Sequence, residues 1–217
     1  MSDRPSSSRR QPRADATRNR RRILDAATSV FAEKGPAATL SDVARTAGVG
    51  IGTIYRNFDD KESLLDALFD DKIDTVIRVA VEAAEVQDPG VAFRTYLWGM
   101  IEAHSLDRSL ATVLFTSNRV DRFPAHLSDQ LASTADGLIA AAIEAGELRA
   151  GFTRQDTTVL AIMVRTIVAA TGETAPGLWR RYADIVVDGT RPTSHAGPLR
   201  PAPLDFTSTA EALGRTL

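Results

Sequence analysis

The stretch from Thr39 to Lys61 reads TLSDVARTAGVGIGTIYRNFDDK, and it decides how the N-terminal part of the chain folds. It reads as two short helices joined by a tight turn, followed at once by the start of a longer helix. The small side chain of Ala44 lets the helices approach closely, and Gly48 lets the chain reverse with a positive φ. Ile54 is expected to pack the second helix onto the first. This pattern is typical of a helix-turn-helix, which presents its second helix to the major groove of DNA.

Helix-end signals surround this stretch. Thr39 is a predicted N-cap, with Asp42 three residues later as its capping-box partner. Asp59 is expected to cap the following helix, with Glu62 at the reciprocal position. The first helix should end at Lys34, where a glycine and a proline follow. The helices expected in this part of the chain cover residues 15–34, 40–47 and 51–57.

Beyond residue 60, apolar residues continue to recur at spacings of three and four, which predicts helices. No alternating strand pattern of useful length is present, so the sequence indicates an all-α fold of about nine helices. Glycine and proline clusters, including Asp88-Pro89-Gly90, separate the helices. After the long fourth helix, the expected helices cover residues 91–106, 108–118, 124–145, 154–172 and 176–189.

The composition suggests four regions along the 217 residues. The first is rich in Ser, Pro and Arg and is expected to be a disordered basic arm. A three-helix DNA-binding domain and a larger helical domain for ligand binding and dimerisation follow, and the last region is a Pro-rich tail. The expected bounds are residues 1–13, 14–60, 61–190 and 191–217.

Charge is distributed unevenly. Residues 1–58 carry 11 Lys and Arg against 5 Asp and Glu, a net charge of +6, and residues 59–217 carry a net charge of −8. The basic end is therefore the end that holds the helix-turn-helix, as a module facing phosphates requires. The chain has no cysteine, no signal-like apolar segment and no run long enough to span a bilayer, so a cytoplasmic protein is expected.

The N-terminal pattern resembles the TetR/AcrR family of bacterial transcriptional repressors over about 50 consecutive residues. That resemblance implies a dimer that binds a palindromic double-stranded DNA operator, a small-molecule pocket in the C-terminal domain, and release of DNA when the effector binds. The residues that carry it are Thr17-Arg18, Ile23 to Ala27, Phe31 to Gly35, Thr39, Asp42 to Ala44, Ala47 to Val49, Gly52 to Tyr55, Phe58, Lys61-Glu62 and Leu64-Leu65.

Phosphate contacts fix the register of a DNA-binding protein, and the resemblance implies several of them here. Tyr55 is expected to contact a phosphate through its hydroxyl, with packing against Phe58 as the alternative. Lys61, at the start of the fourth helix, is expected to meet the DNA backbone. Thr39 is expected to be both a cap and a phosphate donor. Flanking contacts are expected from Thr17 and Arg18.

Base readout is expected from the exposed face of the helix over residues 51–57, chiefly from Thr53 and Arg56. Gly50 and Ile51 replace the polar residues that are more common at these two positions in the family. They therefore offer few side-chain hydrogen bonds to bases. Ile51 can still pack on a thymine methyl group, and Arg56 can reach a guanine or a phosphate. Gly52 permits close approach of the backbone. The basic segment Arg9–Arg22 is a candidate minor-groove arm.

The sequence of the expected ligand-binding domain contains fewer specific motifs than that of the DNA-binding domain. Arg165 interrupts an apolar run, and a buried charge needs a partner. It holds either an anionic ligand or a carboxylate of the protein, and the sequence leaves both open. The candidates for ligand contact are Phe93, Trp98, Met100, His104, Phe115, His126, Met163 and Arg165.

The last two long helices, about residues 154–172 and 176–189, carry wide apolar faces. Two such helices from each protomer would form a four-helix homodimer interface.

An enzyme is disfavoured, because the sequence shows no metal-ligand cluster, cofactor-binding loop or nucleophile motif. The remaining alternatives are an activator of the same fold and a non-specific architectural DNA-binding protein.

Overall fold

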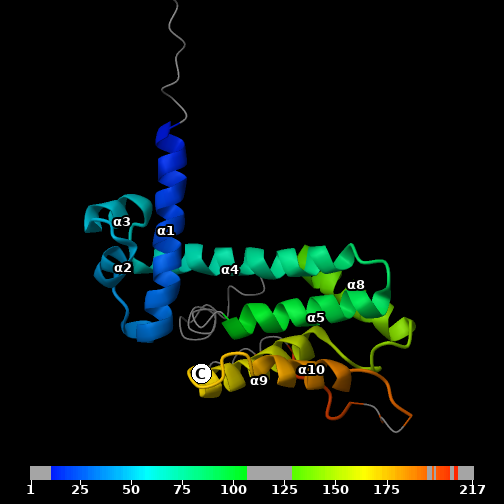
Figure 1. The fold of residues 1–217 in the computed structure, drawn as a ribbon. Helices are drawn as coiled ribbons and strands as arrows, with labels where there is room; N and C mark the ends of the chain where they lie inside the picture. Colours follow the sequence, from blue (N-terminus) through cyan, green and yellow to red (C-terminus); the bar gives the residue numbers. More distant parts are fainter. Residues whose placement is uncertain (1–10, 107–128, 195–196, 198, 206–207, 210–217) are drawn as a thin grey trace, which may run out of the picture. The chain divides into compact units, whose positions relative to one another are not determined.

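The computed structural model describes residues 11–106, 129–194, 197, 199–205 and 208–209. These residues form eight α-helices and one 3₁₀ helix without a strand, which confirms the all-α prediction (Figure 1). The helix expected over residues 108–118 lies outside the described residues. The elements are α1 (Gln11–Lys34), η1 (Gly35–Ala37), α2 (Leu40–Ala47), α3 (Ile51–Asn57), α4 (Lys61–Ala84), α5 (Pro89–Leu106), α8 (Asp129–Glu144), α9 (Arg154–Thr171) and α10 (Trp179–Gly189).

The chain divides into two compact units, Met1–Leu68 and Phe69–Leu217. The division therefore falls eight residues beyond the boundary expected at residue 60, because the first two turns of α4 pack with the helices before them. Leu64 and Leu68 of these turns are fully buried. The two units are described separately below.

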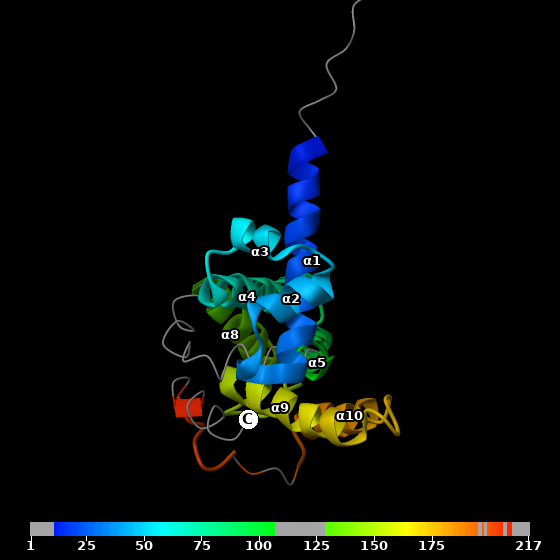
Figure 2. The same cartoon turned by 90° about the vertical axis from the view of Figure 1, so that its left-hand side faces the viewer.

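In the first unit, α2 packs against α1 and α3 packs against α2 (Figure 2). The apolar stripe of α1 follows the helical repeat and includes Ile23, Ala27 and Phe31, all buried. Val43 of α2 and Ile54 of α3 are fully buried as well. The predicted role of Ile54 as the contact between the two short helices is therefore confirmed.

Two helices begin earlier than expected. The helix α1 starts at Gln11 rather than near residue 15, so residues 11–13 are helical and not part of a disordered arm. The cause is local, because Pro12 is tolerated in a first helical turn and Ala and Arg after it are good helix formers. The helix α5 starts at Pro89, since the Asp88 carboxylate accepts a hydrogen bond of 2.8 Å from the Val91 N–H.

The predicted cap of α4 was wrong by one residue. Asp60, not Asp59, is the cap: its Oδ1 accepts from the Ser63 N–H at 2.7 Å, and the Asp60 N–H donates to the Ser63 hydroxyl at 3.2 Å. A serine completes this capping box as well as Glu62 would have done. The helix α10 begins at Trp179 instead of residue 176, because the preceding residues form tight turns such as the one closed by Leu178 N–H and Ala175 O.

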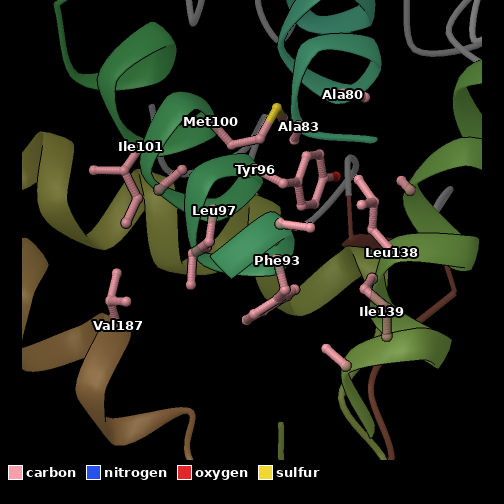
Figure 3. Close-up of a cluster of buried hydrophobic side chains, with 14 of the residues drawn as sticks. Ala80, Ala83, Phe93, Tyr96, Leu97, Met100, Ile101, Leu138, Ile139 and Val187 are labelled. Atoms are coloured by element: carbon pink, nitrogen blue, oxygen red, sulfur yellow. The ribbon is translucent and has the colours of Figure 1, made fainter. Parts of the chain in front are cut away.

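The core of the second unit surrounds α5, which packs against α8, α9 and α10. Figure 3 shows side chains from α4, α5, α8 and α10 meeting in this core. Phe93 contacts Phe152 edge-to-face, with ring centroids 5.3 Å apart. Tyr96 is buried among these apolar groups, and burial raises the pKa of its phenol to about 12, so the ring stays neutral.

The tail after α10 returns to this unit. Arg149 Nη2 donates to the Gly197 carbonyl at 3.0 Å, and the Arg149 N–H donates to the Thr190 carbonyl at 3.0 Å. Leu199 is half-buried and packs against the core. The described part of the Pro-rich tail is thus in contact with the protein surface.

Candidate nucleic-acid interface

The start of α2 is fixed by a capping box with a charged network around it. The Thr39 hydroxyl donates to Asp42 Oδ2 at 2.7 Å and accepts from the Asp42 N–H at 3.2 Å. Lys34 Nζ and Arg45 Nη2 both contact Asp42 Oδ1, at 2.6 and 2.7 Å. The hydrogen bond from Lys34, followed by that from Thr39, holds the pKa of Asp42 well below its usual range. The predicted cap is confirmed.

The turn between α2 and α3 depends on Gly48, which has a φ of 63°. The Gly48 N–H bonds to Arg45 O and the Val49 N–H bonds to Ala44 O, which is the pattern of a Schellman motif. Arg22 of α1 donates to the Ala47 carbonyl at 2.8 Å and so satisfies another carbonyl at the end of α2. The turn therefore holds α3 in a fixed direction relative to α2.

The outer face of α3 is unusually apolar. Ile51 is 42% exposed and Tyr55, one turn later, is 54% exposed. Tyr55 is therefore not packed into the unit, and its hydroxyl is available to a partner. Gly50 and Gly52 have open space where a Cβ atom would lie. The first turn of α3 is consequently narrow, and Ile51 is its one large exposed side chain.

The polar residues of α3 form a local network. Arg56 Nη2 donates to the Thr53 hydroxyl at 3.1 Å, and the Asn57 amide donates to the Thr53 carbonyl at 2.8 Å. Thr53 is half-buried and Arg56 is exposed. The Arg56 guanidinium is thus exposed while it bonds to Thr53.

Lys61 lies at the first residue of α4 and also connects distant parts of the unit. Its ammonium donates to the Pro36 carbonyl at 2.6 Å and lies 5.6 Å from the centre of the Phe31 ring. The residue has three donors, so one hydrogen bond to Pro36 leaves capacity for a phosphate. The structure therefore gives Lys61 a stabilising role that the sequence did not indicate.

The arginines of α1 correct the expectation of a long minor-groove arm. The Arg20 guanidinium stacks 4.6 Å from the centre of the Phe58 ring, and Arg21 pairs with Asp25 at 3.0 Å. Together with Arg22, they belong to a helix and contact their own unit. Residues 1–10 lie outside the described residues. Thr17 and Arg18 are exposed on α1.

The six described candidates for ligand contact differ in burial. Phe93, Met100 and His104 are buried on α5, and Trp98 packs on Trp179 with ring centroids 5.8 Å apart. Met163 is 53% exposed. Arg165 is half-buried on α9. Phe115 and His126 lie outside the described residues.

Two grooves that the sequence did not indicate lie in the second unit. One of about 250 Å³ lies beside the end of α10 and the start of α9, and Leu199 of the tail helps to line it. The other, of about 310 Å³, lies between the α4–α5 turn and α8. Neither is lined by a residue predicted to contact ligand, because turns and the returning tail form them, and such contacts leave no periodic signal.

Searches for other kinds of site gave negative results. Among the described residues, no group of three or more His, Cys, Asp and Glu side chains could hold a metal ion. None of the described helices is long and apolar enough to cross a membrane.

Comparison with known proteins also indicates DNA binding. Residues 23–68 match the family model for bacterial regulatory proteins of the tetR family. Residues 88–192 match the model for the C-terminal domain of SbtR-like transcriptional regulators. The HTH-type transcriptional repressor Rv3405c of Mycobacterium tuberculosis is 39% identical over 71 residues, which are 32% of this chain and 38% of the relative. The chain thus matches less than half of the length of this relative.

Solved structures extend the similarity to most of the chain. The TetR transcriptional regulator SCO0520 from Streptomyces coelicolor has a TM-score of 0.55 and 29% identity, covering 81% of this chain and 99% of its own. A TetR regulatory protein from Mycobacterium vanbaalenii has a TM-score of 0.55 and 28% identity, and the match covers 83% of this chain and 99% of that protein's chain.

The fold and the site define a helix-turn-helix DNA-binding transcriptional regulator, not an enzyme. The chain belongs to the tetR family of bacterial regulators, with an SbtR-like C-terminal domain.

Proposed function

We propose that the protein is a repressor that binds a palindromic operator as a homodimer and is released by a small molecule. The observation that carries this proposal is the exposed face of α3, where Ile51 and Tyr55 stand out from a rigidly capped helix-turn-helix. The surplus of basic residues in the same part of the chain supports DNA as the partner. The similarity to the repressor Rv3405c supports repression as the outcome.

Phosphate contacts in this proposal come from the starts of α2 and α4 and from exposed residues of α1 and α3. Tyr55 offers an exposed hydroxyl, and Lys61 offers the donors that Pro36 leaves free. Thr39 donates its hydroxyl hydrogen to Asp42, so the hydroxyl must rotate away from the carboxylate to donate to a phosphate. Thr17 and Arg18, exposed on α1, are the flanking contacts.

The homodimer interface is proposed on α9 and α10. Val159 and Met163 of α9 and Tyr182 and Ile185 of α10 are large hydrophobic side chains that remain exposed in one protomer. On each helix the two are three or four residues apart and share a face. A second copy of the same face would bury them, as a twofold operator requires.

The effector is proposed to bind within the second unit, which has its own core and matches the model for the C-terminal domain of SbtR-like transcriptional regulators. Thermal-shift screening against apolar and aromatic acids tests this part, and a stabilising compound that also weakens DNA binding is the expected result. A screen of broad libraries without any such compound would contradict it.

The test of the whole proposal is a reporter fused to the promoter that carries the operator, in cells with and without the gene. Loss of the gene should raise expression, and supplying the wild-type protein should lower it again. A Tyr55→Ala variant should fail to restore repression while accumulating normally. Lower expression after loss of the gene would instead identify an activator and contradict repression.

A further inference from the structure

We propose that Ile51 reads the operator by packing on the 5-methyl group of a thymine in each half-site. The proposal rests on the function proposed above and adds the chemical feature of DNA that α3 recognises. It makes Ile51 a specificity-determining residue that acts through an apolar contact.

The exposure of Ile51 and Tyr55 is the first step. Among the described residues of the first unit, these two are the large hydrophobic side chains that remain exposed. They lie four residues apart and therefore share one face of α3. Every other large apolar side chain described in this unit is at least half-buried, so the exposed pair marks a contact surface.

The surroundings of Ile51 are the second step. No heavy atom lies within 4 Å of a Cβ atom placed at Gly50 or Gly52. The side chain of Ile51 can therefore reach a base edge without steric competition from its neighbours. The two glycines also let the backbone of this turn come close to the DNA.

The engagement of the Thr53 hydroxyl is the third step. The Thr53 hydroxyl is half-buried and already accepts from Arg56. Among the base edges in the major groove, the thymine methyl group is the apolar feature, and the others present hydrogen-bonding atoms. An isoleucine against a cytosine amino group or a guanine carbonyl would leave that polar group without water or a partner, which is unfavourable. Thymine is therefore the base that Ile51 favours.

The experiment replaces thymine by deoxyuridine, which keeps base pairing with adenine and removes only the methyl group. The operator is first obtained by selection from random double-stranded DNA with the full-length protein. Each thymine of one half-site is then replaced in turn. At one position the affinity should fall about fourfold, the equivalent of about 0.8 kcal/mol for one buried methyl group.

The matched variant is Ile51→Ala. Because Ile51 is exposed, the variant should keep the melting temperature of the wild type. It should bind the operator more weakly and should bind the thymine and uracil operators equally at the sensitive position. A Tyr55→Phe variant, which changes the neighbouring side chain on the same face, should keep the uracil effect.

Two outcomes would overturn the inference alone. One is an operator at which no thymine is sensitive to uracil, and the other is a uracil effect of equal size in Ile51→Ala. A selection that recovers no preferred sequence would instead overturn the proposed function itself, and the inference with it.

Discussion

At the scale of single residues, Asp42 organises the start of the helix-turn-helix. One carboxylate accepts from the Thr39 hydroxyl and backbone, from Lys34 and from Arg45. We expect Asp42→Asn to lower the melting temperature at pH 7 more than Asp25→Asn, which breaks an exposed pair with Arg21. Thermal unfolding of both variants, followed by circular dichroism, checks this expectation. Equal effects of the two substitutions would contradict it.

The same carboxylate predicts a pH dependence. The pKa of Asp42 lies below its usual value of 3.8 in the folded protein, so its ionised form stabilises the fold. That stabilisation is fully present above pH 4 to 5 and is lost as the pH falls further toward the folded-state pKa. The difference in free energy of unfolding between wild type and Asp42→Asn should therefore be constant from pH 7 to 5 and shrink below pH 4. Urea titrations at each pH measure it, and a difference that grows on acidification would exclude this role.

The exposed hydroxyl of Tyr55 leads to a prediction about operator affinity. Tyr55→Phe removes one hydroxyl from an exposed side chain, so the melting temperature should not change. If the hydroxyl donates to a phosphate, operator affinity should fall by about 1 kcal/mol, or about fivefold. Fluorescence anisotropy with labelled operator measures the change, and an unaltered affinity would show that the hydroxyl makes no such contact.

Residue contacts over short sequence distances were predictable. The Thr39 cap, the positive φ of Gly48 and the burial of Ile54 all follow from spacing within a few residues. The hydrogen bonds from Arg22 to Ala47 and from Lys61 to Pro36 were not predicted, because each joins residues 25 apart. A long basic side chain has many possible partners, and its sequence neighbours do not select one.

At the scale of elements, the contact of α4 with α5 depends on a glycine. A Cβ atom at Gly99 would lie 2.5 Å from Val79 Cγ1, whereas one at Gly137 in α8 would have no neighbour within 4 Å. Gly99→Ala should therefore lower the free energy of unfolding by about 1–3 kcal/mol through overpacking. Gly137→Ala should raise it by about 0.5–1 kcal/mol, because alanine favours a helix.

Chemical denaturation of the two variants gives the measurement. The combination of Gly99→Ala with Val79→Ala should recover part of the lost stability, since it removes the clashing methyl group. Similar effects of Gly99→Ala and Gly137→Ala would show that α4 and α5 do not approach this closely.

Helix existence was easier to predict than helix ends. Repeats of three and four apolar residues indicated each described helix, but Asp60 caps α4 where Asp59 was expected, and Pro89 begins α5 where residue 91 was expected. Adjacent residues of the same capping type, Asp59 and Asp60, cannot be distinguished by composition. The choice depends on which one aligns Leu64 and Leu68 with the core.

At the scale of the whole molecule, dimerisation is the property that the operator requires. Ile185 on α10 is 57% exposed and Val91 on α5 is 41% exposed, so both tolerate a charge in a single protomer. Ile185→Glu should shift the protein toward monomer and weaken operator binding about tenfold or more, whereas Val91→Glu should change neither property. Sedimentation equilibrium and anisotropy check the two effects, and a dimer that persists in Ile185→Glu would place the interface elsewhere.

The grouping of the candidate DNA contacts on one helix was predictable from the sequence, whereas the packing around the candidate ligand contacts was not. The residues of α3 are consecutive, so one motif brings them together, and their exposure follows from the burial of Ile54 on the opposite face. The ligand candidates were chosen by residue type on separate helices. Three of them, Phe93, Met100 and His104, are buried, and Met163 is exposed, because the helical repeat does not fix how helices distant in sequence pack.

The central claim is that α3, carried by a dimer, reads a specific DNA sequence. Repeated selection of random double-stranded DNA with the full-length protein, followed by sequencing, tests it most directly. The account predicts enrichment of one inverted repeat, whose binding survives an excess of random DNA and is lost in Tyr55→Ala. Recovery of no preferred sequence, or of a single half-site without its inverted copy, would contradict it.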